Sequence, residues 1–436
     1  MARSKARVYT CCALMLLCVV AVIVCIAVLV RRKCPGDTFS SAAVAADSGR
    51  CSQIARDILQ KGGSAVDGAI AALLCTSVIN PQSMGLGGGS IFTVMDSSGK
   101  VKIINSRETV PGKFKSDLLK SCPKTFQFMS GGTLTAQDLA SYNVTVTDAW
   151  AVPLGEYQMY IPPPPAGGII LSFILNVMKG YNLNPASLVG EQKTLAYHRL
   201  VEAFKFANGL KKHIRDPRFS SEEMARKFTE DSFAKHIQSL ISSDKTHDPQ
   251  YYNITPYLDS MGTTHVSVLA EDGSAVSVTS TINHIFGSRV VSPRTGVILN
   301  NQLYDFCGRV DNIFPGEQPP SSMAPAVLKS QSKTLVIGST GGSMITTGII
   351  SALVNHLWFG KSLKEAIAAP VVFVDSQNAV KFEPGFDKNV IEALKALGHK
   401  HESAKYFFNV VNAVEKKDGC ICAVSDARKL GEAAGY

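Results

Sequence analysis

Acidic residues are absent from the first 33 positions of this 436-residue chain. Six of the basic residues that contribute to its formal net charge of +9 lie there, at positions 3, 5, 7 and 31–33. The remainder therefore carries only about +3. Such a small net charge argues against a nucleic-acid-binding surface.

Charge is also missing from Tyr9 to Val30, about 22 mostly apolar residues, which is long enough to span a bilayer. The length of this run and the basic residues directly after it favour an uncleaved signal-anchor over a cleaved signal peptide. Three basic residues lie on each side, so their balance does not fix the orientation. Sequons at Asn143 and Asn253 lie only downstream of the run. We therefore expect a cytosolic tail (1–8), an anchor (9–30) and an extracellular domain.

Metal and phosphate motifs are missing as well. The cysteines beyond the apolar run include no Cys-x-x-Cys pair and no zinc-type spacing. The glycine-rich run Gly85–Gly89 is not followed by the Lys-Ser/Thr of a phosphate-binding loop. We expect neither a metal nor a cofactor, and we interpret the glycines as points of close backbone approach.

The most informative stretch runs from Gly262 to Asn283. Two β-rich runs flank Glu271-Asp272-Gly273, which predicts a hairpin with positive φ angles at Asp272 and Gly273. Thr263 begins the first run. If the preceding peptide bond were cut, Thr263 would carry both a hydroxyl nucleophile and an α-amine base. A Gly-Thr pair before a strand is most often only the end of a loop, so this interpretation depends on the rest of the chain.

Further motifs occur in a fixed order along the chain. They are Gly262–Val268, Thr281–Asn283, Asn300–Asp305, Ser321–Pro325, Gly341–Ser343 and Gly431–Tyr436. Together they resemble the gamma-glutamyltransferase family, and the region up to Gly89 is similar to its leukotriene-C4-cleaving branch. The resemblance implies an α+β fold, the four-layer αββα sandwich of N-terminal-nucleophile hydrolases, preceded by a single transmembrane helix.

The resemblance also implies catalytic roles. Thr263 would be the nucleophile, Thr281 on the facing strand would bind its hydroxyl, and the backbone N–H groups of Gly341 and Gly342 would form the oxyanion hole. His265 shares a strand face with Thr263 but lies two residues away, roughly 6–7 Å, so we interpret it as structural. Cleavage between Gly262 and Thr263 would separate a large subunit (31–262) from a small catalytic subunit (263–436).

Six residues would hold the amino-acid head of the substrate. By resemblance they are Arg107, Ser321 and Ser322 at the carboxylate, and Asn283, Gln302 and Asp305 at the ammonium. An arginine fork suits a carboxylate because it donates two parallel hydrogen bonds. Gln302 replaces the glutamate expected in vertebrate members, and its carbonyl accepts a hydrogen bond without adding charge. The family also implies a disulfide between Cys51 and Cys75.

The implied reaction is extracellular γ-glutamyl transfer and hydrolysis. Its donors would be glutathione and glutathione S-conjugates such as leukotriene C4, and its acceptors would be water, amino acids or dipeptides. One departure stands out. Only about two dozen residues separate Thr109 from the Thr133–Leu139 motif, where family members have well over a hundred. A catalytically inactive membrane glycoprotein is therefore an alternative. A third candidate, an amidase for acylated lactams, fits less well because Arg107 with Asp305 suits a zwitterion.

Local patterns give a coarse secondary structure. Residues 195–214 read as an outer amphipathic helix with one charged face, and residues 344–358 as one continuous helix. Residues 296–300 read as a strand. Residues 220–256 are polar, and we expect that segment to be mobile.

Overall fold

The computed structural model describes residues 15–20, 34–114, 134–254, 262–307, 309, 312–402, 407 and 409–436. The chain divides into two units, Met1–Thr38 and Phe39–Tyr436. In the first unit, residues 15–20 are helical, and most of the expected anchor (9–30) lies outside the described residues. None of the helices in the described ranges combines the length and apolarity that crossing a membrane requires.

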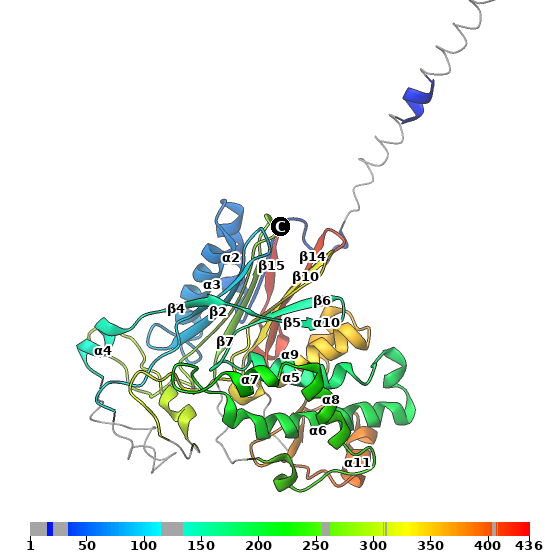
Figure 1. Ribbon diagram of the computed structural model, residues 1–436. Helices are drawn as coiled ribbons and strands as arrows, with labels where there is room; N and C mark the ends of the chain where they lie inside the picture. Colours follow the sequence, from blue (N-terminus) through cyan, green and yellow to red (C-terminus); the bar gives the residue numbers. More distant parts are fainter. Residues whose placement is uncertain are drawn as a thin grey trace, which may run out of the picture. The chain divides into compact units, whose positions relative to one another are not determined.

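The second unit is built on two antiparallel sheets (Figure 1). The seven-stranded sheet has the order β15 (Ala433–Gly435), β1 (Ala43–Ala46), β7 (Thr264–Leu269), β8 (Ala275–Thr281), β2 (Gly89–Met95), β3 (Val101–Asn105), β4 (Thr145–Asp148). The six-stranded sheet has the order β14 (Cys420–Val424), β13 (Val411–Lys417), β10 (Lys333–Ser339), β9 (Ala326–Lys329), β6 (Tyr157–Ile161), β5 (Trp150–Leu154). In both sheets, strands from before and after position 263 lie side by side.

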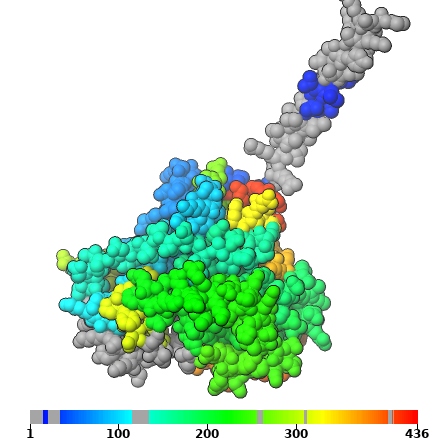
Figure 2. Space-filling view, in the orientation of Figure 1, coloured from blue at the N-terminus to red at the C-terminus, as the bar shows by residue number. Residues whose placement is uncertain are grey.

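Helices cover the outer faces of both sheets. On the seven-stranded sheet, α2 (Gly49–Gln60) packs on β1, and α3 (Ala65–Ile79) packs on β7 and β8. The second helical layer contains α5 (Gly168–Lys179), α6 (Gly190–Leu210), α8 (Asp231–Leu240), α9 (Ile345–Leu353) and α10 (Leu363–Ala368). Figure 2 shows the green part of the chain, to which α8 belongs, on the face in view.

The smaller described elements complete the molecule. They are α4 (Ala136–Ser141), α7 (Glu223–Lys227), α11 (Lys388–Ala396), a hairpin of β11 (Val372–Val374) and β12 (Val380–Phe382), and short turns at η3 (Pro185–Leu188), η4 (Lys211–His213), η5 (Pro249–Tyr252), η6 (Gln302–Phe306), η7 (Gly342–Met344), η8 (Val354–Trp358) and η9 (Ala427–Lys429).

Strand alternation sorts the core into layers. In β7, Val266 and Val268 face α2 and α3, whereas Leu269 faces the other sheet, against Val336 of β10. An apolar layer thus lies on each side of the first sheet, and a third lies between the second sheet and its helices. The expected α+β sandwich with two central sheets is therefore present.

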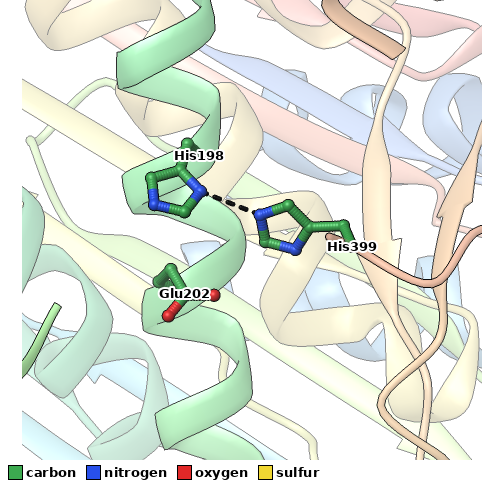
Figure 3. A group of neighbouring side chains, drawn as sticks. All are labelled: His198, Glu202 and His399. Carbon is green, nitrogen blue, oxygen red and sulfur yellow. Dashed lines mark hydrogen bonds between the residues drawn. The ribbon is translucent and has the colours of Figure 1, made fainter. Parts of the chain in front are cut away.

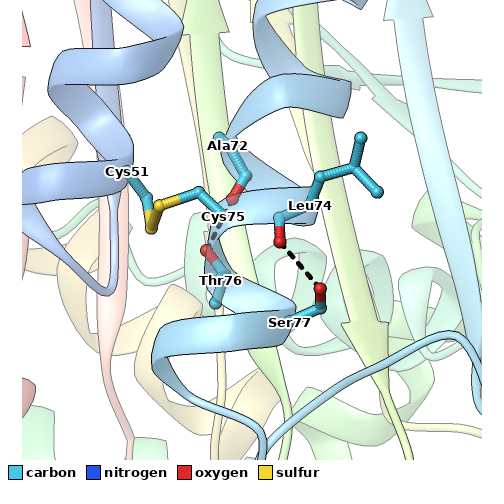
Figure 4. Close-up of a disulfide and its surroundings, with 6 residues drawn as sticks. All are labelled: Cys51, Ala72, Leu74, Cys75, Thr76 and Ser77. Carbon is cyan, nitrogen blue, oxygen red and sulfur yellow. Dashed lines mark hydrogen bonds between the residues drawn. A yellow bond between two sulfur atoms is a disulfide. The ribbon is translucent and has the colours of Figure 1, made fainter. Parts of the chain in front are cut away.

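A disulfide joins the first two helices (Figure 4). Cys51 of α2 and Cys75 of α3 are bonded, as the family resemblance implied, with their Cα atoms 5.4 Å apart. The helix α3 begins with a capping box, in which Ser64 and Asp67 each bind the other's backbone N–H.

Several local expectations were wrong. In the β7–β8 turn only Gly273 has a positive φ, because Asp272 Oδ1 instead accepts from the backbone N–H of Ser274. Residues 296–300 make only an isolated bridge between Val291 and Ile298. The predicted helix 344–358 is divided, since α9 ends at Leu353 and a π-helical turn follows.

Two polar segments also differ from what their composition indicated, one in its order and the other in its burial. Residues 220–256 contain α7, α8 and η5 in their described part, and Ala234 and Ile237 of α8 pack into the core. The helix α6 is not an outer helix, because its central residues are buried, including Glu202 and Lys205. Polar and charged composition was a poor guide to these two segments, because charged side chains can be buried when they pair with one another.

Candidate active site

Thr263 lies just before β7 and is 3% exposed. Its hydroxyl donates to Thr281 Oγ1 at 3.0 Å. Thr281, the last residue of β8, also accepts from the backbone N–H of Asn283 at 2.8 Å. The two strands of the hairpin therefore hold the hydroxyl in one place. Thr263 also has a φ of 94°, which is strained for a β-branched residue.

The carbonyl before Thr263 has its own donor. The backbone N–H of Gly341 donates to Gly262 O at 3.0 Å. Gly341 and Gly342 follow β10 with φ angles of 105° and 59°, which glycine adopts without a steric penalty. A Cβ atom at position 262 would lie 1.9 Å from Asn283 O, so this position requires glycine for close approach. The structure thus brings an expected oxyanion donor to the carbonyl of the expected cleavage site.

Arg107 follows β3 and is 1% exposed. Its guanidinium donates to Asp305 Oδ2 at 2.6 Å and to the carbonyls of Pro319 and Pro320, each at 2.9 Å. Ser321 follows directly, and its hydroxyl accepts from the backbone N–H of Met323. The fold therefore brings Arg107, Asp305 and Ser321 together, although they come from distant segments of the chain.

The ammonium-binding candidates lie near both this arginine and Thr263. Asn283 Nδ2 donates to Asn301 O at 3.1 Å. Burial raises the pKa of the Asp305 carboxyl, while Arg107 and Asn283 counteract part of the rise. Gln302 donates to Thr281 O at 3.3 Å, but its Oε1 atom is buried without a partner in the described part of the chain. One hydrogen bond thus joins Arg107 to Asp305, and a separate pair runs from the Asn283 N–H through Thr281 Oγ1 to the Thr263 hydroxyl.

Glu108 is a residue whose importance the sequence analysis missed. Both of its carboxyl oxygens are buried without a hydrogen-bond partner among the described residues, and the nearest cation, Arg107 Nη1, is 3.9 Å away. Burial raises the pKa of Glu108 to about 7, although Arg107 opposes the rise. Its position next to Arg107 was the available signal in the sequence.

His265 makes contacts that fit a structural residue. Its ring nitrogens pair with Thr279 and Ser267 at 2.9 and 3.0 Å, and the ring lies against Gly338 of the other sheet. Burial lowers its pKa to about 3, so the ring stays neutral.

A second buried polar cluster lies on α6 (Figure 3). His198, Glu202 and His399 bring possible ligand atoms within 4.8 Å of one another. However, His198 Nε2 must donate to Ser242 O, so its Nδ1 accepts from His399 Nε2, and His399 Nδ1 in turn accepts from the Lys205 ammonium. Burial lowers the pKa of both histidines. Every ring nitrogen is thus occupied, which favours an internal hydrogen-bond network over a metal site.

The sequons and a surface cavity involve other residues. Asn143 and Asn253 are both exposed. A cavity of about 550 Å³ is lined by residues that include Asp148, Trp150, Arg218, Arg226 and Gln318. None of the predicted catalytic or substrate-binding residues lines it.

Comparison with known proteins gives the family. The gamma-glutamyltranspeptidase family model matches residues 51–130 and 118–436, which is most of the sequence. The chain belongs to the gamma-glutamyltranspeptidase family. It is 37% identical to glutathione hydrolase 5 proenzyme of Rattus norvegicus and 36% identical to that of Homo sapiens, in each case over 93% of this chain and 94% of the relative. Its activity class is therefore that of a gamma-glutamyltransferase and glutathione hydrolase.

The same comparisons locate the block of residues that family members have after Thr109 and that this chain lacks. The alignment with the rat protein spans 540 positions, yet it takes in only 93% of 436 residues, so more than a hundred positions have no counterpart here. The two matches to the family model meet at residues 118–130, within the short stretch between Thr109 and Thr133.

A solved structure supports the fold. Cephalosporin acylase from Bacillus halodurans superposes with a TM-score of 0.80 at 18% identity, over 93% of this chain and 97% of the acylase. This likeness concerns the fold alone.

Proposed function

We propose that the chain cuts itself between Gly262 and Thr263 and then uses Thr263 to transfer or hydrolyse γ-glutamyl groups. The supporting observation is the convergence at one peptide bond: the Thr263 hydroxyl is held by Thr281 at 3.0 Å, and the Gly262 carbonyl receives the N–H of Gly341 at 3.0 Å. Nucleophile and oxyanion donor are the two parts that acyl transfer needs first.

Cleavage begins in the uncut chain, where Thr263 has no free amine. Its hydroxyl oxygen attacks the Gly262 carbonyl carbon, the Gly262–Thr263 C–N bond breaks, and the nitrogen takes up a proton to become the α-amine. Water then hydrolyses the Gly262 ester. The products are the large subunit, ending at 262, and the small subunit 263–436. An α-amine has an ordinary pKa of about 7.7–8.0, so the freed amine can serve as the base in later turnovers.

Donor binding uses the groups between Arg107 and Thr263. In the structure Arg107 pairs with Asp305. An amino-acid head exchanges that pair for two, with its carboxylate on Arg107 and the Ser321-Ser322 segment, and its ammonium on Asp305 and Asn283. The unpartnered Oε1 of Gln302 is a further acceptor for the ammonium. The γ-carbonyl then reaches Thr263, with Gly341 and Gly342 as donors to the developing oxyanion.

The proposed donors are glutathione and glutathione S-conjugates such as leukotriene C4, with water, amino acids or dipeptides as acceptors. Mass spectrometry would separate the two donors. Loss of the glutamyl group from leukotriene C4 supports the conjugate assignment, whereas turnover of glutathione alone contradicts it.

Amino-terminal sequencing tests the mechanism. A small fragment that starts at Thr263, absent from Thr263→Ala, is the expected result. The missing block and the closed Arg107–Asp305 pair favour one alternative, an inactive family glycoprotein. A folded, glycosylated chain that stays in one piece would establish that alternative.

We propose further that residues 9–30 anchor the chain with residues 1–8 in the cytosol and the remainder outside, glycosylated at Asn143 and Asn253. The exposure of both asparagines supports glycosylation. Glycosidase treatment of the membrane fraction should increase the mobility of the chain in electrophoresis. An unchanged mobility, together with full digestion by protease added outside sealed microsomes, would contradict this topology.

A further inference from the structure

A lysine near the C-terminus contacts the expected nucleophile. The Nζ atom of Lys429 donates to the backbone carbonyl of Thr263 at 2.8 Å. The same ammonium pairs with Asp47 Oδ2 at 2.9 Å. The Lys429 side chain is 21% exposed, whereas that of Asp47 is 1% exposed. A buried carboxylate therefore fixes the ammonium, and the ammonium fixes the Thr263 carbonyl.

The same group of side chains holds the next two residues. Asp47 also accepts from Thr264 Oγ1 and from Asn412 Nδ2, each at 2.7 Å. Asn412 Nδ2 in turn donates to His265 O at 2.9 Å. Three consecutive residues, beginning with the nucleophile, are thus held by side chains from the end of β1, from β13 and from η9.

The nucleophile needs such support. Thr263 lies outside the β7 ladder, whose pairing with β8 begins at Thr264. Its φ of 94° is strained for a β-branched residue and persists only if neighbouring groups impose it. The Lys429 ammonium fixes the peptide plane on one side of the Thr263 Cα, and the Gly341 N–H fixes the carbonyl on the other.

We propose that Lys429, held by Asp47, is a positioning residue for self-cleavage. This inference rests on the proposed function. Asp47 directly follows β1, and Lys429 lies only four residues before β15, which pairs with β1. The two ends of the second unit must therefore dock before Thr263 is aligned. Cleavage is thereby made to depend on completed folding, because the aligning ion pair joins residues from both ends.

The rate of cleavage in pulse-labelled full-length chains tests this role without any substrate. Lys429→Met removes the donor to Thr263 and should slow the appearance of the fragment that begins at Thr263 by roughly ten- to a hundred-fold. Lys429→Arg keeps both a donor and the ion pair and should recover most of the rate. Lys333→Met is the matched control, since Lys333 has a similar exposure of 24% and also pairs with a carboxylate, Glu156. It should cleave as the parent does.

A second variant separates positioning from folding. Lys429→Met leaves Asp47 buried without its cation, which destabilises the fold. Asp47→Asn combined with Lys429→Met removes both charges. We expect this double variant to melt near the parent temperature and still cleave slowly. A double variant that folds and cleaves at the parent rate overturns the inference alone. A parent that never cleaves overturns the proposed self-cleavage, and the inference with it.

Discussion

At position 262 the chain has no room for a side chain, because Asn283 O lies where a Cβ atom would be, at 1.9 Å. Gly262→Ala should therefore move the scissile carbonyl away from the Gly341 N–H and reduce self-cleavage at least ten-fold. Electrophoresis under denaturing conditions measures the fraction of cut chain. Gly85→Ala is the control, since a Cβ atom there has no neighbour within 4 Å. Equal cleavage by Gly262→Ala and the parent would contradict the assignment of the oxyanion donor.

Glu108 predicts a pH dependence of stability. Its pKa is raised from 4.5 to about 7 in the folded chain. The folded state therefore binds the proton more tightly, and this contribution to stability is complete below pH 4.5 and is lost as the pH rises through 7. Glu108→Gln stays neutral, so above pH 7 it should be more stable than the parent, by on the order of 1–3 kcal/mol.

Urea denaturation at pH 5 and pH 8 would measure this effect. The difference between variant and parent should be small at pH 5 and largest at pH 8. Glu392→Gln, whose side chain is 69% exposed, should show no such trend. A gain for Glu108→Gln that is equal at both pH values would refute the assignment of the raised pKa to this carboxyl.

At the scale of secondary structure, the disulfide between α2 and α3 closes a loop of 24 residues. Such a crosslink restricts the unfolded chain and typically contributes about 2–4 kcal/mol. Replacing both Cys51 and Cys75 by alanine should lower the free energy of unfolding by that amount, while cleavage at Thr263 continues at low temperature. Identical urea midpoints for the parent and the double variant would show that the crosslink contributes nothing.

Elements with a strong local signal were predictable from the sequence. The alternation around Asp272-Gly273 placed β7 and β8 correctly. The strand predicted at 296–300 is absent, because loop contacts such as Leu299 N–H to Val290 O hold that segment and no sheet does. The burial of α6 was missed because Lys205 pairs with His399, which is 194 residues away.

The residues of the candidate site were also predictable only in part. Motif order alone led to Arg107, Asp305, Asn283 and Thr281. In the structure Arg107 pairs with Asp305, and the Asn283 N–H donates to Thr281 Oγ1. Neither Lys429 nor Asp47 was singled out, although Lys429 lies two residues before the Gly431–Tyr436 motif. Their importance comes from a contact with a backbone carbonyl, which leaves no pattern in a sequence.

At the scale of the whole molecule, the two expected subunits alternate within both sheets. β1 lies between β15 and β7, β2 pairs with β8, and β6 pairs with β9. After cleavage the fragments of 262 and 174 residues, whose lengths follow from the 436-residue chain, should co-elute in native size-exclusion chromatography. They should separate only in denaturant. Separation in native buffer would contradict this strand order.

Because the strands of the two fragments are interleaved, cleavage also changes how the protein refolds. An uncut chain reaches its native state as a single molecule, with its own backbone keeping the two halves close together. Once the bond is gone, the same sheets can be rebuilt only when two separate chains meet, so recovery from denaturant should become second order. Uncut Thr263→Ala should regain its fold equally well at every dilution, whereas the cut protein should recover less as it is diluted.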